Sequence, residues 1–373
     1  MRLLHTADWH LGKTLMNYSL IDDQKFILKK FLEVVDKLEP HAIIIAGDIY
    51  DRADPSTEAV ELFDEILFDL TERKIHVLCI AGNHDSAERL NFGSRLFANK
   101  KFFITAKTTL EPTTIPIADD FGEVYFSLIP FFEPGKIREK FFGANSERLT
   151  YNDANKFYVD LARKKIPVGV RSVAIAHVFL SGGVESDSER KFVGGTANVD
   201  TKIFSGYDYV ALGHLHAHQK VSAENVCYSG SPLKYSASEA NHVKGVTFVE
   251  LNANGFVDAK NIPLTPRRDL IKVEGTLKNF LNQPPNDAYA YVTLTDDKFV
   301  YDAAQKLRKV FPHLMEAKNK SRPKNFVETP TRTFREGANI SEQFADFFAA
   351  MTRRPLTDDE QIAMAEIFKE IRQ

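Results

Sequence analysis

The sequence contains little cysteine and no long hydrophobic run. Its only cysteines, Cys79 and Cys227, lie in strand-like surroundings, which favours buried, reduced thiols in a cytosolic protein. The longest apolar runs, such as 42–46 and 173–176, fall far short of the ~20 residues that span a bilayer. No secretory signal follows Met1. We therefore expect a cytoplasmic protein with no membrane segment.

A strong charge of one sign is also missing. The 48 Lys and Arg residues nearly balance the 51 Asp and Glu residues, for a formal charge of -3. This balance argues against a protein that holds nucleic acid by overall charge alone. It still allows a nucleic-acid substrate if part of the negative charge belongs to metal-binding carboxylates. The length of 373 residues is more than one core comfortably holds, so two domains are the natural expectation.

The first 265 residues alternate between short apolar runs and helical patterns. The runs are rich in Val, Ile and Leu and lie at 3–4, 43–46, 77–81, 124–129, 173–176 and 209–212. Between the early runs, apolar residues recur at three- and four-residue spacing, as in Ile27, Phe31 and Val35. A further helix is expected to open at Asp54-Pro55, with Asp54 as its cap. This alternation predicts an α/β fold in which helices flank a layered sheet.

The pattern changes after Pro263 and Pro266. Apolar segments at 270–273 and 289–294 and a helical pattern at 303–310 predict a small α+β domain of roughly 70 residues. A linker is expected at 329–331. Two amphipathic helices follow, and the second opens at a capping box formed by Thr357 and Glu360. Their apolar residues are Ile340, Phe344, Phe347, Phe348 and Met351 in the first helix, and Ile362, Met364, Ile367, Phe368 and Ile371 in the second.

Metal-competent side chains follow five of the predicted strands. They are Asp8 and His10 after the first strand, Asp48 after the second, Asn83 after the third, His177 after a later one, and His214 and His216 after another. Each residue alone has an ordinary structural explanation, as a turn former or a satisfied core histidine. Their recurrence at strand ends favours a site instead, because ligands gather at the carboxyl edge of open α/β sheets.

Two cations are the chemistry that such a set supports. A pair of cations ~3.5–4 Å apart activates a water molecule and holds phosphate oxygens, which helps to cleave a very unreactive phosphodiester. Asp48 is the natural bridge, since one carboxylate between two cations offsets their repulsion. A mixed oxygen and nitrogen shell without cysteine suits manganese better than a thiolate zinc site.

His84 directly follows Asn83 and precedes Asp85. A histidine held by a carboxylate contacts a transition-state oxyanion or protonates the leaving oxygen, so we predict catalytic roles for His84 and Asp85. The alternative is that His84 is a spectator outside the site.

Four motifs carry a resemblance to a known family. They are Asp-Trp-His-Leu-Gly at 8–12, Gly-Asp-Ile-Tyr-Asp at 47–51, Gly-Asn-His-Asp at 82–85 and Gly-His-Leu-His at 213–216. In order and spacing they resemble the calcineurin-like metallophosphoesterase superfamily. More closely, the chain is similar to bacterial nucleases of that superfamily that act with a partner ATPase. The segments Ser-Asp-Ser-Glu-Arg at 186–190 and Tyr-Ser-Gly-Ser-Pro at 228–232 add to this likeness.

The resemblance implies a metal-ligand set and an activity. One metal would be held by Asp8, His10, Asp48 and His216, and the other by Asp48, Asn83, His177 and His214. His84 would stabilise the phosphate. The metals would be two Mn²⁺, or Mg²⁺ or other divalent ions, and the substrate DNA. The activities would be 3′-to-5′ exonuclease on duplexes and endonuclease on single strands or hairpins, in repair, recombination and replication. Some relatives carry histidine where this chain has Asp51, which puts a catalytic role there in doubt.

The resemblance also implies an architecture and partners. The fold would be a four-layer αββα sandwich at 1–265, with a DNA-capping domain at 266–335 and helices at 336–373 that bind the ATPase. Two such nuclease chains would form a dimer in a two-plus-two assembly. Because isolated helices of ~15 residues are marginal in water, the tail helices need a partner surface, unless they fold back on their own domain.

Two other functions remain open from the sequence. One is a metallophosphatase that acts on a small-molecule or protein phosphoester, although a capping domain and tail helices serve no purpose in a compact phosphatase. The other is a non-catalytic scaffold on the same fold, although such a protein usually loses ligands and all seven are present here.

Overall fold

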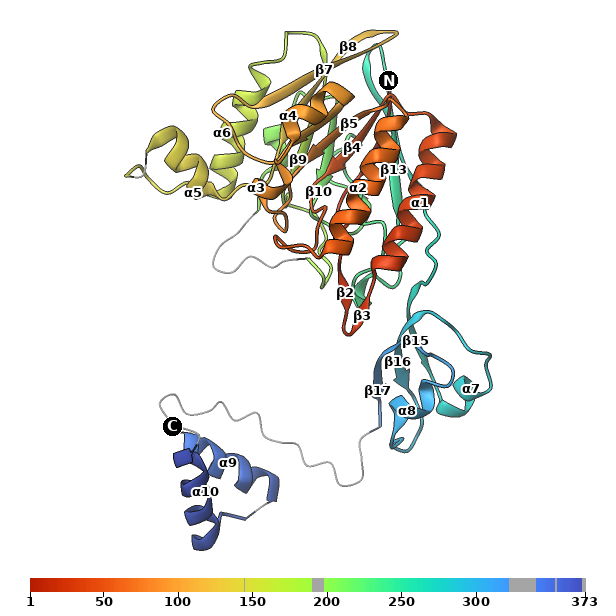
Figure 1. The fold of residues 1–373 in the computed structure, drawn as a ribbon, viewed down its shortest axis with the longest axis vertical. Coiled ribbons are helices and arrows are strands. Elements are labelled where there is room, and N and C mark those ends of the chain that lie inside the picture. Colours follow the sequence, from red (N-terminus) through yellow and green to blue (C-terminus); the bar gives the residue numbers. More distant parts are fainter. Residues whose placement is uncertain (144, 190–197, 322–339, 353, 371–373) are drawn as a thin grey trace. The chain divides into compact units, whose positions relative to one another are not determined.

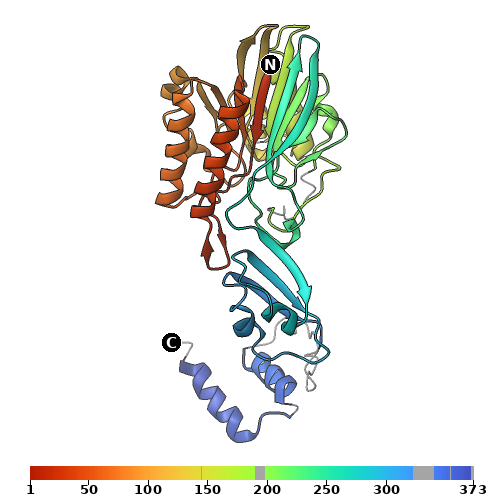
Figure 2. The same cartoon turned by 90° about the vertical axis from the view of Figure 1, so that its right-hand side faces the viewer.

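The computed structural model describes residues 1–143, 145–189, 198–321, 340–352 and 354–370 (Figures 1 and 2). The chain divides into two compact units, one of residues 1–294 and 302–318 and the other of residues 295–301 and 319–373. The predicted linker at 329–331 and the predicted boundary at 335/336 lie outside the described residues. Among the described residues, no helix has the length and apolar character needed to cross a membrane.

Two six-stranded sheets form the centre of the first unit. The first sheet has the order β14-β13-β1-β4-β5-β6 and consists of β1 (Arg2–Thr6), β4 (Ala42–Ala46), β5 (His76–Ile80), β6 (Phe102–Thr105), β13 (Gly245–Asn252) and β14 (Gly255–Pro263). The second has the order β11-β12-β10-β9-β8-β7 and consists of β7 (Thr113–Asp119), β8 (Gly122–Ile129), β9 (Arg171–His177), β10 (Tyr209–Gly213), β11 (Gln219–Lys220) and β12 (Val226–Tyr228).

The sheets pack face to face, and helices cover their outer faces. An apolar core between the sheets combines residues such as Leu3, Ile44 and Leu78 with Phe126, Ile175 and Tyr209. The helices of this region are α1 (Ile21–Leu38), α2 (Thr57–Glu72), α3 (Ala87–Leu90), α4 (Ser94–Phe97), α5 (Pro134–Ile137) and α6 (Tyr151–Arg163). A second core joins α1 and α2 to the first sheet (Figure 2), and a third joins α6 to the second sheet. The predicted four-layer α/β architecture is therefore confirmed.

Parallel pairing brings the strand ends that precede the predicted ligands to one edge of each sheet. β1, β4 and β5 are parallel neighbours, and so are β9 and β10. The carboxyl ends of parallel strands meet at the same edge of a sheet, so the residues that follow these strands are brought together.

A smaller α+β layer follows the two sheets. Its strands have the order β15-β16-β17, and its elements are β15 (Leu270–Gly275), α7 (Leu277–Leu281), β16 (Tyr289–Leu294), α8 (Ala303–Leu307) and β17 (Leu314–Asn319). A short hairpin of β2 (Thr14–Leu15) and β3 (Tyr18–Ser19) precedes α1, and the hydroxyl of Tyr18 donates to the carbonyl of Pro312 at 3.3 Å.

The second predicted helix begins later than expected. Ser56 caps α2 and accepts a hydrogen bond from the Ala59 N–H at 3.3 Å. Asp54, the expected cap, instead forms an exposed ion pair with Arg89. Ser56 has the extended backbone (φ -69°, ψ 159°) that a cap requires, so the serine two residues on satisfies the first turn.

The C-terminal helices α9 (Ile340–Thr352) and α10 (Asp358–Glu370) pack against each other, with the rings of Phe344 and Phe368 5.9 Å apart. The predicted capping box is confirmed: the Thr357 N–H donates to Glu360, and the Glu360 N–H donates to the Thr357 hydroxyl. Phe347 is 54% exposed. The side chains of Ile340 and Met351, and residue Ile371, lie outside the described part of the chain.

Candidate metal centre

The seven predicted ligands converge on one buried site. Asp8 and His10 follow β1, Asp48 follows β4, Asn83 follows β5, His177 ends β9, and His214 and His216 follow β10. Six of them are at most 3% exposed, and Asn83 is half-buried. Because burying a polar group without compensation is costly, so many buried polar side chains in one place indicate a ligand.

Sharp turns and glycines let the strand ends approach one another. Asp8, His10 and Asp48 have positive φ angles of 54°, 46° and 49°, which non-glycine residues rarely adopt. A Cβ atom on Gly82 would lie 2.1 Å from Asp48 Oδ1, so only glycine fits there. This strained, closely packed backbone is typical of functional sites.

Asp8, His10 and His216 form the first group of predicted ligands, with candidate ligand atoms all within 4.8 Å of one another. The Nε2 atoms of His10 and His216 are 3.1 Å apart. The Ser188 hydroxyl donates to Glu239, so it accepts from His216 Nδ1–H, at 2.7 Å. The neutral ring therefore presents the Nε2 lone pair to His10.

The facing nitrogens fit a cation. Asp51 Oδ1 lies 3.5 Å from Nδ1 of His10, which favours a lone pair on Nε2 of that ring as well. Two lone pairs that face each other repel unless a positive ion lies between them. Burial lowers the pKa of His216 to about 3, so this ring stays neutral, as a metal ligand must.

Asp48, Asn83, His177 and His214 form the second group. Asn83 Oδ1 lies 3.0 Å from both His177 Nε2 and His214 Nδ1. His177 Nδ1–H donates to the Ala46 carbonyl at 2.8 Å, which directs Nε2 toward Asp48 Oδ2, 3.4 Å away. The carboxylate of Asp48 also lies 3.8 Å from His10, so it reaches both groups.

The buried carboxylates of the site favour the binding of a cation. Burial raises the pKa of Asp8 well above its ordinary value. Burial also opposes ionisation of Asp48, but His177 and His10 outweigh it and hold the pKa of Asp48 well below its usual range. Burial alone would lower the pKa of His177, yet Asp48 and Asp8 raise it to about 9. Buried carboxylates thus draw a cation, and divalent metal ions meet the same demand.

His84 lies beside this centre but is not held as predicted. Its Nδ1–H donates to the Asp51 carbonyl at 2.8 Å, and its ring centroid lies 4.7 Å from that of His10. The expectation that a carboxylate holds this ring is wrong. The Asp85 carboxylate instead accepts hydrogen bonds from the backbone N–H groups of Gly82, Ile49 and Tyr50, so it is engaged by the backbone and not by the His84 ring.

Several supporting residues were not predicted. Glu239 and Lys244 form a buried ion pair behind His216, and Lys244 also donates to the His216 carbonyl at 2.7 Å. Gln24, in α1, donates to the His10 carbonyl at 2.7 Å. Ser188 lies in the segment that carried the family likeness, so that likeness was a reason to look there. No sequence pattern marks Glu239 or Gln24 as a supporting residue, because neither is near a predicted ligand in sequence.

Comparison with known families identifies the class. Residues 1–218, more than half of the chain, match the calcineurin-like phosphoesterase family, and residues 266–352 match a family described as the type 5 capsule protein repressor C-terminal domain. The chain therefore belongs to the calcineurin-like phosphoesterases and is a metal-dependent phosphodiesterase.

The particular group follows from a curated relative. The chain is 36% identical over 325 residues to the SbcD subunit of the SbcCD nuclease of Staphylococcus epidermidis, and the match covers 86% of this chain and 85% of the relative. Within its family, the chain thus belongs with the SbcD proteins.

Two solved structures are more distantly similar. TT1561 of Thermus thermophilus is 13% identical to this chain, with a TM-score of 0.41. The match covers 70% of this chain and 98% of TT1561. The calcineurin-like phosphoesterase YfkN from Bacillus subtilis is 13% identical, with a TM-score of 0.38. That match covers 71% of this chain and 90% of the YfkN chain.

Proposed function

We propose that this chain is the two-metal DNA nuclease subunit of an ATP-dependent SbcCD complex that acts in DNA repair, recombination and replication. The observation that carries the proposal is the convergence of seven metal-competent side chains from five strand ends, in a chain 36% identical to a nuclease subunit. The proposed activities are 3′-to-5′ exonuclease on duplexes and endonuclease on single strands and hairpins.

Two ligand groups would hold the metals. Asp8, His10, Asp48 and His216 would bind one ion, and Asp48, Asn83, His177 and His214 the other. The reach of Asp48 to both His10 and His177 supports its role as the shared ligand. The oxygen and imidazole donors support manganese. When bound, such a pair activates water and polarises the phosphate.

His84 would act on the phosphate directly. Its Nδ1 is tied to a backbone carbonyl, so Nε2 remains to donate to a phosphate oxygen or to protonate the leaving oxygen. Asp85 joins the loop after Asp48 to the loop that carries Asn83, so we assign it a positioning role rather than contact with the substrate.

A cleft beside the metal centre supports DNA as the substrate. The cleft has a volume of about 470 Å³ and is lined by Phe131 and by three lysines and two glutamates, which leave an excess of positive charge: Lys107, Lys136, Lys140, Glu88 and Glu139. The Phe131 ring lies edge-on to the proposed ligand His177, with centroids 6.4 Å apart. Lysines that follow a strand backbone and an aromatic ring that stacks on a base are the means by which single strands are held.

The two C-terminal helices support a protein partner. Phe347, Ile362 and Ile367 are 54%, 61% and 47% exposed, although α9 and α10 pack on each other. Exposed apolar side chains on paired helices favour docking on another surface. We propose that residues 336–373 bind the SbcC ATPase and that residues 266–335 guide DNA onto the phosphoesterase domain of residues 1–265.

Further exposed side chains support a homodimer within a two-plus-two assembly. Phe68 on α2 is 64% exposed, and Phe92 and Leu96 after the His84 loop are 85% and 73% exposed. A DNA substrate and two free, buried cysteines also support action in the cytoplasm.

The test compares two substrates and two proteins. With Mn²⁺, the wild type should degrade an end-labelled duplex much faster than it hydrolyses p-nitrophenyl phosphate, a monoester. His84→Ala should keep its metals and lose duplex cutting, with and without SbcC. Preference for the monoester would support a phosphatase instead, and unchanged cutting by His84→Ala would remove this residue from the mechanism.

A further inference from the structure

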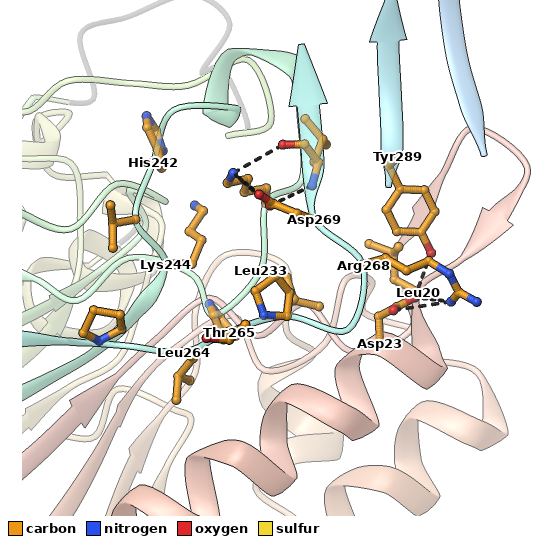
Figure 3. A pocket seen from close by; sticks show the side chains of 16 residues that line it. Leu20, Asp23, Leu233, His242, Lys244, Leu264, Thr265, Arg268, Asp269 and Tyr289 are labelled. Carbon is orange, nitrogen blue, oxygen red and sulfur yellow. Dashed lines mark hydrogen bonds and ion pairs between the residues drawn. The ribbon is translucent and has the colours of Figure 1, made fainter. Parts of the chain in front are cut away.

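The junction between the two-sheet core and the β15–β17 layer contains a cavity of about 190 Å³ (Figure 3). The chain passes from the core into the layer through residues 263–270, and the cavity-lining residues belong to the same compact unit. Arg268 and Asp269, just before β15, carry opposite charges and bind different parts of the phosphoesterase core. Neither residue has a role in the proposed chemistry.

Arg268 binds the side of the core that supports His10. Its guanidinium lies 3.3 Å from Asp23 Oδ2, which also accepts a 2.7 Å hydrogen bond from the hydroxyl of Tyr289 in β16. Figure 3 shows both side chains turned toward Asp23. Asp23 is 1% exposed and lies in the first turn of α1, so this contact is fixed within the core.

Gln24, the next residue of α1, holds the loop that carries His10. Its side-chain N–H groups donate to the carbonyl of His10 at 2.7 Å and to that of Trp9 at 3.2 Å. Its carbonyl oxygen accepts from the Gly12 N–H at 3.0 Å. One turn of helix therefore connects the β15–β16 layer to the backbone of a proposed metal ligand.

Asp269 binds the side of the core that supports His216. Its carboxylate lies 2.8 Å from Nζ of Lys234, which donates to the Ala240 carbonyl at 2.7 Å. Ala240 directly follows Glu239, whose carboxylate accepts from the Ser188 hydroxyl that orients His216. The second contact therefore also ends one residue from a group that positions a ligand.

We propose that Arg268 and Asp269 are positioning residues that couple the placement of the β15–β17 layer to the His10–His216 pair. This inference rests on the proposed metal centre. The two histidines are presented by separate loops with their Nε2 atoms 3.1 Å apart. A shift of either loop therefore changes the geometry available to one metal ion. Leu270, Tyr289 and Met315 of the layer are buried in the same apolar core as α1, so a displacement of the layer is transmitted to the elements that support both loops. DNA or a partner that moves this layer would thereby tune the metal site.

Direct Mn²⁺ binding tests the coupling in the full-length protein. Titration calorimetry should show Mn²⁺ affinity at one of two sites weakened by up to about 10-fold in Arg268→Ala and in Asp269→Asn, because the smallest loss for a direct partner of a ligand is the upper limit for these more remote residues. Hydrolysis of bis(p-nitrophenyl) phosphate, a diester too small to need the β15–β17 layer, should fall in parallel at limiting Mn²⁺. Tyr289→Phe removes only a hydroxyl and should act in the same direction with intact folding, checked by melting temperature.

Arg267→Ala is the matched control, because Arg267 is an exposed residue of the same charge next to Arg268. It should leave Mn²⁺ affinity unchanged even if it weakens DNA binding. The coupling is overturned if the wild type binds two Mn²⁺ and Arg268→Ala, Asp269→Asn and Tyr289→Phe all bind them as Arg267→Ala does. In that outcome the proposed function stands. A wild type that binds no Mn²⁺ would overturn the metal centre and the coupling together.

Discussion

At the scale of single residues, the centre depends on glycines as well as on ligands. Gly82 leaves so little space that a methyl group there would lie 2.1 Å from the carboxylate oxygen of Asp48 and 2.4 Å from its backbone nitrogen. Contacts below 3.0 Å require a shift, and the atoms concerned belong to the proposed shared ligand. The close approach of the loops after β4 and β5 is therefore part of the site.

Gly82→Ala should reduce activity by about 100-fold, because displacing a reacting group by ~1 Å has that effect. Gly135→Ala is the control, since a Cβ there meets nothing within 4 Å. Both variants should be compared by duplex digestion at saturating Mn²⁺ and by melting temperature. If Gly82→Ala cut as fast as Gly135→Ala, the tight approach would have no functional meaning.

The convergence of the proposed ligands could be predicted from the sequence, but the residues that support them could not. Asp8, Asp48 and His177 each follow a short apolar run, so the edge that they share was visible in the chain order. Glu239 stands behind His216 only because the chain folds back between β12 and β13. No local pattern marks such a residue, since its partner is set by the tertiary fold.

At the scale of secondary structure, one buried ion pair joins two strands of the second sheet. Asp119, at the end of β7, forms a bidentate ion pair with Arg171, at the start of β9. The two guanidinium nitrogens lie 2.5 and 3.0 Å from the carboxylate oxygens. Their side chains are 3% and 7% exposed. Burial opposes ionisation of Asp119, but Arg171 and the N-terminal amino group of Met1, 2.7 Å from the carboxylate, outweigh it and hold the pKa of Asp119 well below its usual range.

Asp119→Asn should destabilise the protein by about 3–5 kcal/mol, because it leaves Arg171 buried without its charged partner. A lowered pKa in the folded state stabilises the protein above the ordinary carboxyl pKa, and this stabilisation is lost as the pH falls. The difference in melting temperature between the two proteins should therefore be full at pH 7 and shrink below about pH 4.

The neighbouring Asp120 is exposed, so Asp120→Asn is the control and should melt as the wild type does at both pH values. An Asp119→Asn deficit that stayed constant down to pH 3 would contradict an electrostatic origin.

Helix positions were predicted better than helix ends. The spacing of Phe63 and Ile66 indicated α2 correctly, because a buried apolar stripe has a definite period. The cap was wrong by two residues, since Asp54 and Ser56 are both good caps and only the backbone at Ser56 decides between them. The capping box of α10 was predicted correctly because two residues at fixed spacing, Thr357 and Glu360, specify it together.

At the scale of the whole molecule, the paired C-terminal helices are proposed to bind the ATPase. Phe347→Asp places a charge on the exposed side of α9 and leaves the packed Phe344 and Phe368 untouched. We expect it to weaken binding to SbcC at least 10-fold, which is ~1.4 kcal/mol, by loss of one buried aromatic anchor. Isothermal titration calorimetry with purified SbcC gives the dissociation constant.

Hydrolysis of bis(p-nitrophenyl) phosphate by Phe347→Asp should remain at the wild-type rate, since the metal centre is built from other elements. Asp346→Ala, at an exposed neighbouring position, is the control and should bind SbcC normally. Equal affinity of Phe347→Asp and Asp346→Ala would exclude this side of α9 from the interface.

The number of manganese ions bound per chain tests the central claim most directly. Inductively coupled plasma mass spectrometry after Mn²⁺ reconstitution and desalting should find two ions in the wild type and two in His84→Ala. Asp48→Ala should retain fewer than one, because it removes the carboxylate that both ligand groups share. A wild type with one ion or none, or an Asp48→Ala protein that keeps two, would contradict a paired metal centre built around Asp48.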